Sequence, residues 1–229
     1  VKADQIFELI KIPNLTLHKL ENKNSLAFLK PTKDFFVGSS SENVSCKKNQ
    51  SQNFNEKYLE AQKGFNKYND DFFRKIKLKY IVLCSELEIA GIPALGFANP
   101  EMKTLILNIN TNNSNFERVL HHEIFHIIEN NFNKYFLNIS WSDLNSKEFK
   151  YSACSTCSNN YSLEKIYNSK GFVSEYAKST ISEDMAETFS FMMSDNNLIL
   201  DMISKDEILN KKVKLIENLV NKLDAKHQY

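Results

Sequence analysis

The pentapeptide His122-Glu123-Ile124-Phe125-His126 combines the residue types and the spacing of a zinc site. Residues four apart on a helix share a face, so the two imidazoles would project together. Two imidazole nitrogens placed in this way can bind one Zn²⁺ ion, each at about 2.0–2.1 Å. Glu123 could then take a proton from a zinc-bound water. The pentapeptide therefore predicts hydrolytic chemistry at a metal centre.

A second acidic segment offers a third ligand, since catalytic zinc takes three protein ligands and keeps one open position. Glu183 and Glu187 are four residues apart, so a helix would place them on one face. Either could bind the metal while the other accepts a hydrogen bond from a ligand histidine. The helix dipole also favours acids at a helix start without any metal, which would account for Glu183 and Asp184 but less well for Glu187.

The pentapeptide also occurs by chance in unrelated chains, where its histidines are ordinary surface residues. Here its helix is apolar at Ile124, Phe125, Ile127 and Ile128, which indicates a core helix. Histidines in such a helix need polar partners, and a metal would supply them. His121 points about 100° away from His122, so we interpret it as a substrate-side or packing residue.

The elements that position these residues follow from hydrophobic spacing. We expect two short strands, at 80–84 and 104–109, from their apolar runs. Four longer helices are expected, at 55–79, 116–132, 183–193 and 205–222, and a short helix is expected near 163–167. Asn113, Ser114 or Asn115 could cap the helix at 116–132, and Thr180 or Ser182 the helix at 183–193. The prediction is an α+β fold, mainly helical, with a small mixed sheet beside the helix at 116–132.

The domain organisation is less distinct. Residues 1–53 are expected to be an irregular N-terminal segment, with a short strand at 35–38 and a polar loop around Cys46. Residues 54–229 would then form the main domain, although 1–229 could also be a single domain.

The composition and charge of the chain argue against some classes of function. Hydrophobic residues make up 42% of the 229-residue chain, charged residues 25%, and the net charge is +1. The balanced charge argues against nucleic acid as a partner, and no apolar stretch is long enough to span a membrane. We expect a monomer whose partner is a peptide or protein substrate.

Two of the four cysteines form a C-x-x-C pair, Cys154 and Cys157, in a polar stretch. Without a second such pair, a zinc ribbon is not favoured, and we predict a surface loop with a local disulfide in preference to free thiols. A disulfide fits a secreted, cell-surface or periplasmic protein. Because Val1 is not followed by a basic-then-apolar stretch, we expect that a signal segment has been removed.

A family resemblance rests on a two-part motif. Residues 183–189 read E-x-x-A-E-x-F, and Tyr176 lies seven residues before Glu183. Together with the H-E-x-x-H at 122–126, this arrangement resembles the gluzincin metallopeptidases. More narrowly, it is similar to the catalytic domain of anthrax lethal factor and its relatives, which include the clostridial Pro-Pro endopeptidases.

Four further segments resemble the bacterial putative zinc-binding metallopeptidases. They read GFVSEYA at 171–177, EDMAE at 183–187, WSDLN at 141–145 and FKY at 149–151. The resemblance to both groups covers roughly residues 104–193. It implies a zincin-like domain and a zinc-dependent endopeptidase.

The resemblance implies that His122, His126 and Glu183 bind zinc. Asp184 departs from the aromatic residue that most lethal-factor relatives have there. It and Glu187 are the alternative third ligands, and otherwise we expect both beside the ligand set.

The remaining roles are also implied by the resemblance. Glu123 would be the general base, and Tyr176 would donate a hydrogen bond to the oxyanion of the reaction. Glu187 would accept a hydrogen bond from a ligand histidine, and we expect this histidine to be His122. The strand at 104–109 would be the edge strand that pairs with substrate, with Leu105 and Leu107 lining the substrate site.

Three alternatives stay open. The chain could be a zinc-binding interaction module without activity, although such a module would need neither Glu123 nor Tyr176. It could be a zinc hydrolase that acts on a non-peptide amide, which the sequence does not distinguish from a peptidase. It could also be a helical domain without metal.

Overall fold

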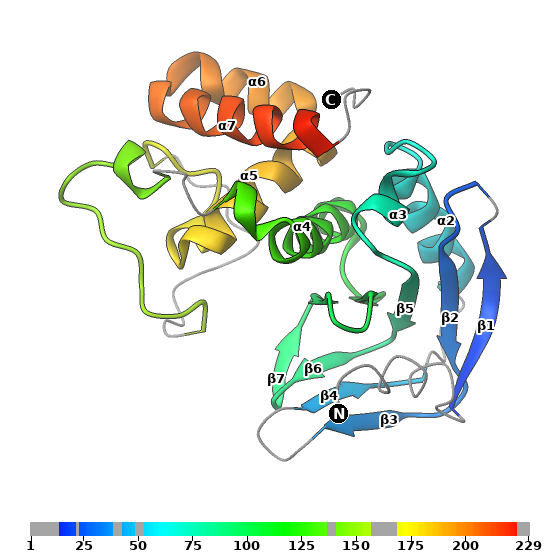
Figure 1. The fold of residues 1–229 in the computed structure, drawn as a ribbon. Helices are drawn as coiled ribbons and strands as arrows, with labels where there is room; N and C mark the ends of the chain where they lie inside the picture. Colours follow the sequence, from blue (N-terminus) through cyan, green and yellow to red (C-terminus); the bar gives the residue numbers. More distant parts are fainter. Residues whose placement is uncertain are drawn as a thin grey trace. The chain divides into compact units, whose positions relative to one another are not determined.

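The computed structural model describes residues 14–21, 23–38, 43–48, 53–136, 141–156 and 169–223 (Figure 1). The chain separates into two compact units, Val1–Asn131 and Phe132–Tyr229. Helices and mixed sheets occur together, so the α+β class is confirmed. Among the described residues, no helix has the length and apolarity to cross a membrane. The predicted domain boundary at 53/54 stays a prediction.

The first unit contains a five-stranded mixed sheet. Its strand order is β1 (Leu15–Leu20), β2 (Ala27–Pro31), β5 (Tyr80–Cys84), β9 (Thr104–Asn108) and β8 (Gly96–Asn99). The three central strands run parallel, and β1 and β8 are antiparallel to their neighbours. The parallel strands read as apolar runs because sheets of this kind are covered on both faces.

A second sheet of the same unit is antiparallel throughout. Its order is β3 (Phe35–Gly38), β4 (Asn43–Cys46), β6 (Leu87–Ile89) and β7 (Ile92–Ala94). A buried apolar cluster draws residues from both sheets, among them Leu29, Val82 and Leu87. A disulfide between Cys46 and Cys84 joins β4 to β5.

The prediction that residues 1–53 are irregular is wrong for the described part of that range. Four strands, β1 to β4, lie there, and only the strand at 35–38 was predicted. β1 shows why: of its six residues only Leu15 is buried, so the apolar run that predicts a strand is missing. Its pairing with β2 defines it instead.

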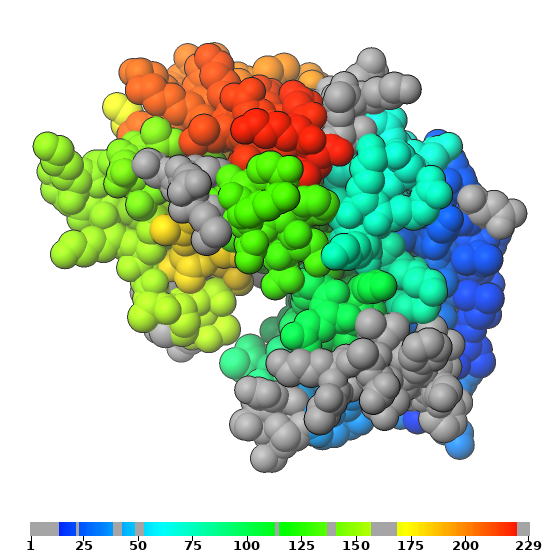
Figure 2. All heavy atoms as spheres, viewed as in Figure 1, coloured from blue at the N-terminus to red at the C-terminus, as the bar shows by residue number. Residues whose placement is uncertain are grey.

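The single helix predicted for 55–79 is two helices, α2 (Phe54–Phe65) and α3 (Phe72–Lys75). The intervening residues are rich in Asn and Asp, whose side chains compete for backbone hydrogen bonds and favour turns. The Tyr58 ring of α2 packs edge-on against Phe28 of β2. In the space-filling view, the cyan surface of α2 and α3 adjoins the blue surface of β1 and β2 (Figure 2).

Helix α4 (Asn113–Asn131) contains the pentapeptide and confirms the helix predicted at 116–132. Its cap, Asn112, lies one residue before the predicted caps. The Oδ1 atom of Asn112 accepts a hydrogen bond from the backbone N–H of Asn115 at 3.1 Å, which is the N-cap interaction. Within its unit, α4 packs against α2, β8 and β9.

The second unit is helical in its described part, and the short helix predicted near 163–167 lies outside the described residues. Short 3₁₀ helices η1 (Asn133–Tyr135), η2 (Ser142–Leu144) and η3 (Tyr176–Lys178) precede α5 (Ile181–Ser194). Helix α5 confirms the helix predicted at 183–193. Thr180 is its cap, since its hydroxyl accepts from the backbone N–H of Glu183 at 3.2 Å.

The helix predicted for 205–222 corresponds to α7 (Glu207–Leu223), and α6 (Asn196–Lys205) was not predicted. Aspartates separate the three helices. Asp195 caps α6 through the N–H of Leu198, and Asp206 accepts from the backbone at the start of α7. Helix α5 packs against η3, α6 and α7.

Candidate metal centre

The two histidines of the pentapeptide face one another on α4. Their Nε2 atoms are 3.1 Å apart, and their ring planes are inclined at 75°. Two nitrogens each about 2.0–2.1 Å from one Zn²⁺ ion at a tetrahedral angle are about 3.3 Å apart. The observed separation is close to this value, so the imidazole pair fits a zinc ion.

A carboxylate extends this donor set. One ligand atom each from His122, His126 and Glu183 lies within 4.8 Å of the others, so the three side chains could hold a metal ion. Two imidazoles and a carboxylate are a ligand set of catalytic zinc sites. The three side chains are therefore a candidate metal centre.

Glu129, one turn further along α4, was not anticipated as part of this arrangement. Its Oε2 atom lies 3.6 Å from Nδ1 of His126. A carboxylate near Nδ1 favours a proton on that nitrogen, which leaves the Nε2 lone pair available for a metal.

Glu123 lies against the backbone of β8. A Cβ atom added to Gly96 would come within 2.6 Å of Glu123 Cγ and 2.8 Å of its Oε1. Real Cβ atoms do not approach so closely, so a side chain at position 96 would displace the Glu123 carboxylate. The strand thus passes directly beside the carboxylate that is the candidate base.

The prediction that the strand at 104–109 forms the sheet edge is wrong, because the neighbouring strand β8 lies outside it. β9 lies between β5 and β8 and pairs with both, and the side chains of Leu105 and Leu107 are fully buried. Their predicted role in lining a substrate site stays a prediction, although the strand that carries them is not the edge. Within the described residues, β8 pairs with β9 alone and forms the edge.

His121 is a packing residue, one of the two interpretations that the sequence left open. It is fully buried, and its Nδ1 shares a 2.7 Å hydrogen bond with the hydroxyl of Tyr68. Its Nε2 lies 3.5 Å from Glu117, which also pairs with Lys67 at 2.6 Å. Burial alone would raise the pKa of Glu117, but hydrogen bonds from His121 and Lys67 lower it to about 2.

Glu187 is buried on α5, as expected for a residue that supports a ligand. Its Oε2 atom accepts a 2.5 Å hydrogen bond from the Ser174 hydroxyl. Ser174 Oγ in turn accepts from the backbone N–H of Ala177 at 3.1 Å. Tyr176 is partly buried within the same turn, η3.

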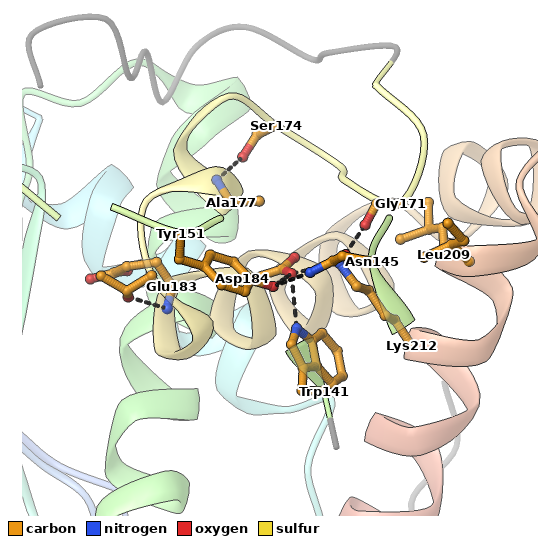
Figure 3. A network of polar contacts seen from close by, with 12 residues as sticks. Trp141, Asn145, Tyr151, Gly171, Ser174, Ala177, Glu183, Asp184, Leu209 and Lys212 are labelled. Carbon is orange, nitrogen blue, oxygen red and sulfur yellow. Dashed lines mark hydrogen bonds and ion pairs between the residues drawn. The ribbon is translucent and has the colours of Figure 1, made fainter. Parts of the chain in front are cut away.

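Asp184 does not take the predicted place beside the ligands but belongs to a separate buried network (Figure 3). Its Oδ2 atom accepts from Trp141 Nε1 at 2.8 Å, from the Tyr151 hydroxyl at 2.5 Å and from Lys212 Nζ at 2.6 Å. Asn145 donates to the Tyr151 hydroxyl at 2.8 Å. Trp141 of the WSDLN segment and Tyr151 of the FKY segment thus contact this one carboxylate, and Asn145 contacts it through Tyr151.

Burial dominates the electrostatics of this network. It raises the pKa of Asp184 although Lys212 lowers it, and it lowers the pKa of Lys212 although Asp184 raises it. Burial, followed by the charge of Asp184, also raises the pKa of Tyr151. An ion pair with this desolvation cost adds little net stability, but loss of one partner leaves a buried charge.

Gly171 begins the GFVSEYA segment with a backbone conformation that favours glycine, at φ +90°. An added Cβ would lie 2.8 Å from the side chain of Ile208. The carbonyl of Gly171 accepts from Lys212 Nζ at 2.7 Å, and its N–H donates to Asp206. This glycine therefore joins the turn before η3 to the start of α7.

Several of these residues had a signal in the sequence. Lys212 lies among the buried positions Leu209, Val213 and Ile216 of α7, where a lysine indicates a buried partner. Ser174 lies inside the GFVSEYA segment. Gly96 had no comparable signal, because only strand pairing brings it to Glu123.

The cysteines agree in part with the prediction. Cys154 is disulfide-bonded, and Cys157, its predicted partner, lies outside the described residues. The bond between Cys46 and Cys84 was not predicted, because 38 positions separate these residues.

A comparison with protein families points to the class that the donor set suggests, zinc-binding metallopeptidases. The model of a family described as "Putative zinc-binding metallo-peptidase" matches residues 58–228, well over half of the chain. The chain therefore belongs to this family.

A solved structure described as a putative zinc-binding metallo-peptidase from Bacteroides caccae ATCC 43185 is similar at 18% identity and a TM-score of 0.42. The similarity covers 75% of each chain. A comparison with curated proteins gave no match.

Proposed function

We propose that this protein is a zinc-dependent endopeptidase in which His122, His126 and Glu183 bind the metal. The observation that supports this most strongly is the pair of Nε2 atoms facing each other at 3.1 Å, with the carboxylate of Glu183 near by. Membership of the zinc-binding metallopeptidase family agrees with it.

Bound zinc supplies a Lewis acid that polarises a carbonyl group and lowers the pKa of water to about 7. Glu123 accepts the proton of the attacking water and passes it to the leaving amine. Tyr176 donates a hydrogen bond to the carbonyl oxygen as negative charge develops there. Glu187 accepts from a ligand imidazole and fixes its tautomer.

The substrate would pair with β8. An extended peptide can add to an exposed sheet edge through main-chain hydrogen bonds. Because Gly96 of β8 lies in contact range of Glu123, a peptide on this edge lies beside the base. This arrangement replaces the pairing of substrate first predicted for the strand at 104–109.

The gluzincin assignment and a secreted location are part of the same proposal. The E-x-x-A-E-x-F helix with Tyr176 before it supports a gluzincin related to anthrax lethal factor and the Pro-Pro endopeptidases. The Cys46–Cys84 disulfide supports a secreted, cell-surface or periplasmic protein, since such bonds persist in oxidising compartments.

Metal analysis combined with a peptide library tests the proposal. Purified protein should hold about one Zn²⁺ per chain. It should cleave library peptides, lose this activity with a chelator and regain it with added zinc. Zinc without cleavage of any amide would indicate an interaction module, and cleavage of non-peptide amides alone would indicate a different hydrolase.

The histidines provide a matched control. His126→Ala should abolish zinc binding, whereas His18→Ala should keep it, because His18 is an exposed residue of β1 in the same unit. Equal zinc content in both variants would remove His126 from the ligand set.

A further inference from the structure

We propose that Ser174 is a positioning residue of the candidate metal centre. Its hydroxyl group holds the Glu187 carboxylate and, at the same time, the turn that begins with Tyr176. This inference rests on the proposed function and adds to it a residue that touches neither metal nor substrate.

The Ser174 hydroxyl accepts one hydrogen bond and donates another. Its Oγ accepts from the backbone N–H of Ala177 at 3.1 Å and donates to Glu187 Oε2 at 2.5 Å. A hydroxyl has one proton, so the acceptor role toward Ala177 leaves that proton for the carboxylate. A separation of 2.5 Å is within the range for a hydroxyl that donates to an ionised carboxylate.

Both hydrogen bonds of Ser174 lie in the protein interior, where water cannot replace them. Ser174 is fully buried and Glu187 nearly so. A buried carboxylate that loses a donor has no bulk water to replace it. Without the Ser174 hydroxyl, the Oε2 atom of Glu187 would lose this donor, and the carboxylate would be held less firmly.

The bond to Ala177 is a local contact between side chain and backbone, in which the serine oxygen accepts from an N–H three residues later. The turn it closes is η3, whose first residue is Tyr176. One hydroxyl thus couples the carboxylate that would orient a ligand to the phenol that would bind the oxyanion. Loss of this hydroxyl should weaken both zinc binding and turnover.

The test measures zinc affinity by competition with a chelating indicator, together with kcat and KM. Ser174→Ala should bind zinc about 10- to 100-fold more weakly, the scale for groups that support metal ligands. Its kcat should fall more than its KM rises. Ser174→Thr keeps the hydroxyl and should recover most of both.

Ser190→Ala is the matched control. Ser190 is equally buried on α5, and its hydroxyl donates to the backbone carbonyl of Glu187 at 2.8 Å instead of to the carboxylate. Its zinc affinity should stay within about twofold of the wild type, since the ligand support is intact. If Ser174→Ala does not fold, Ser174→Cys keeps the volume, weakens the donor and should show the same loss.

The outcomes separate the two proposals. A wild-type protein that binds no zinc overturns the proposed function, and this inference with it. Wild-type zinc binding with unchanged affinity in the folded Ser174 variant overturns the inference alone. An equal loss in Ser190→Ala would also overturn it, because the effect would then be general to buried hydroxyl groups on this segment.

Discussion

The acidic side chains on α4 and on α5 have different surroundings. On α4, Glu123 lies against Gly96, where the facing residue has no side chain. On α5, Glu187 and Asp184 accept hydrogen bonds from buried side chains, Ser174 in the first case and a lysine, a tryptophan and a tyrosine in the second.

The difference corresponds to two tasks. A general base must gain and lose a proton, and the close approach of the Gly96 backbone limits the room that its carboxylate has. A supporting carboxylate must stay ionised and in place, which donors achieve. We therefore expect changes on α4 to reduce turnover and changes around α5 to reduce stability or metal affinity.

Glu123→Gln should have the largest effect on turnover. The amide cannot accept the proton, so kcat should fall about 10²- to 10⁴-fold while zinc content stays the same. Peptide cleavage and metal analysis check this. Glu117→Gln, the same change on the same helix, should retain turnover, and near-wild-type cleavage by Glu123→Gln would exclude Glu123 as the base.

Lys212→Met should have the largest effect on stability. It leaves the buried Asp184 without its cation, which costs about 3–5 kcal/mol, measured by urea unfolding. Lys211→Met is the control, since the exposed Lys211–Glu207 pair should contribute within about 0.5 kcal/mol. Similar unfolding midpoints for the two variants would show that Asp184 is stable without Lys212.

Tyr176→Phe should reduce turnover without reducing metal affinity, although Tyr176 lies in the same segment as Ser174. Loss of the phenol hydroxyl should lower kcat about 10- to 1000-fold, the scale for a single oxyanion donor. Zinc affinity should not change, in contrast to Ser174→Ala. Tyr135→Phe, at a more exposed tyrosine of the same unit, is the control for general effects, and an unchanged kcat for Tyr176→Phe would make Tyr176 a packing residue.

Gly96→Ala should have the smallest effect, because Glu123 can move away from an added methyl group. A displacement of about 1 Å can lower turnover up to about 100-fold, so we expect a 10- to 100-fold loss with unchanged zinc content. In a Glu123→Gln background, Gly96→Ala should cause no further loss. An additional loss there would mean that Gly96 acts through substrate binding on β8.

The sequence predicted the local part of the site well. The helical positions of His122, Glu123 and His126 follow from spacing within a few residues, and so does the cap at Thr180. The packing role of His121 was one of two alternatives and followed from its direction on the helix.

The errors around the site share one physical cause, which is pairing between segments far apart in sequence. Strand order moved the sheet edge from β9 to β8 and buried Leu105 and Leu107. Asp184 was misassigned because its partners Trp141 and Lys212 approach from 43 and 28 residues away. A propensity or a spacing rule contains no information on such contacts.

The Cys46–Cys84 bond ties the two sheets of the first unit across a separation of 38 residues. Closing a loop of this size raises the free energy of the unfolded chain by about 4 kcal/mol. This is a large fraction of the net stability of a typical domain. Thiols stay reduced in the cytosol, so a newly synthesised chain would lack this support until export. In the secreted protein proposed above, the sheet that contains β5 and β8 would therefore reach its full stability only outside the cytosol.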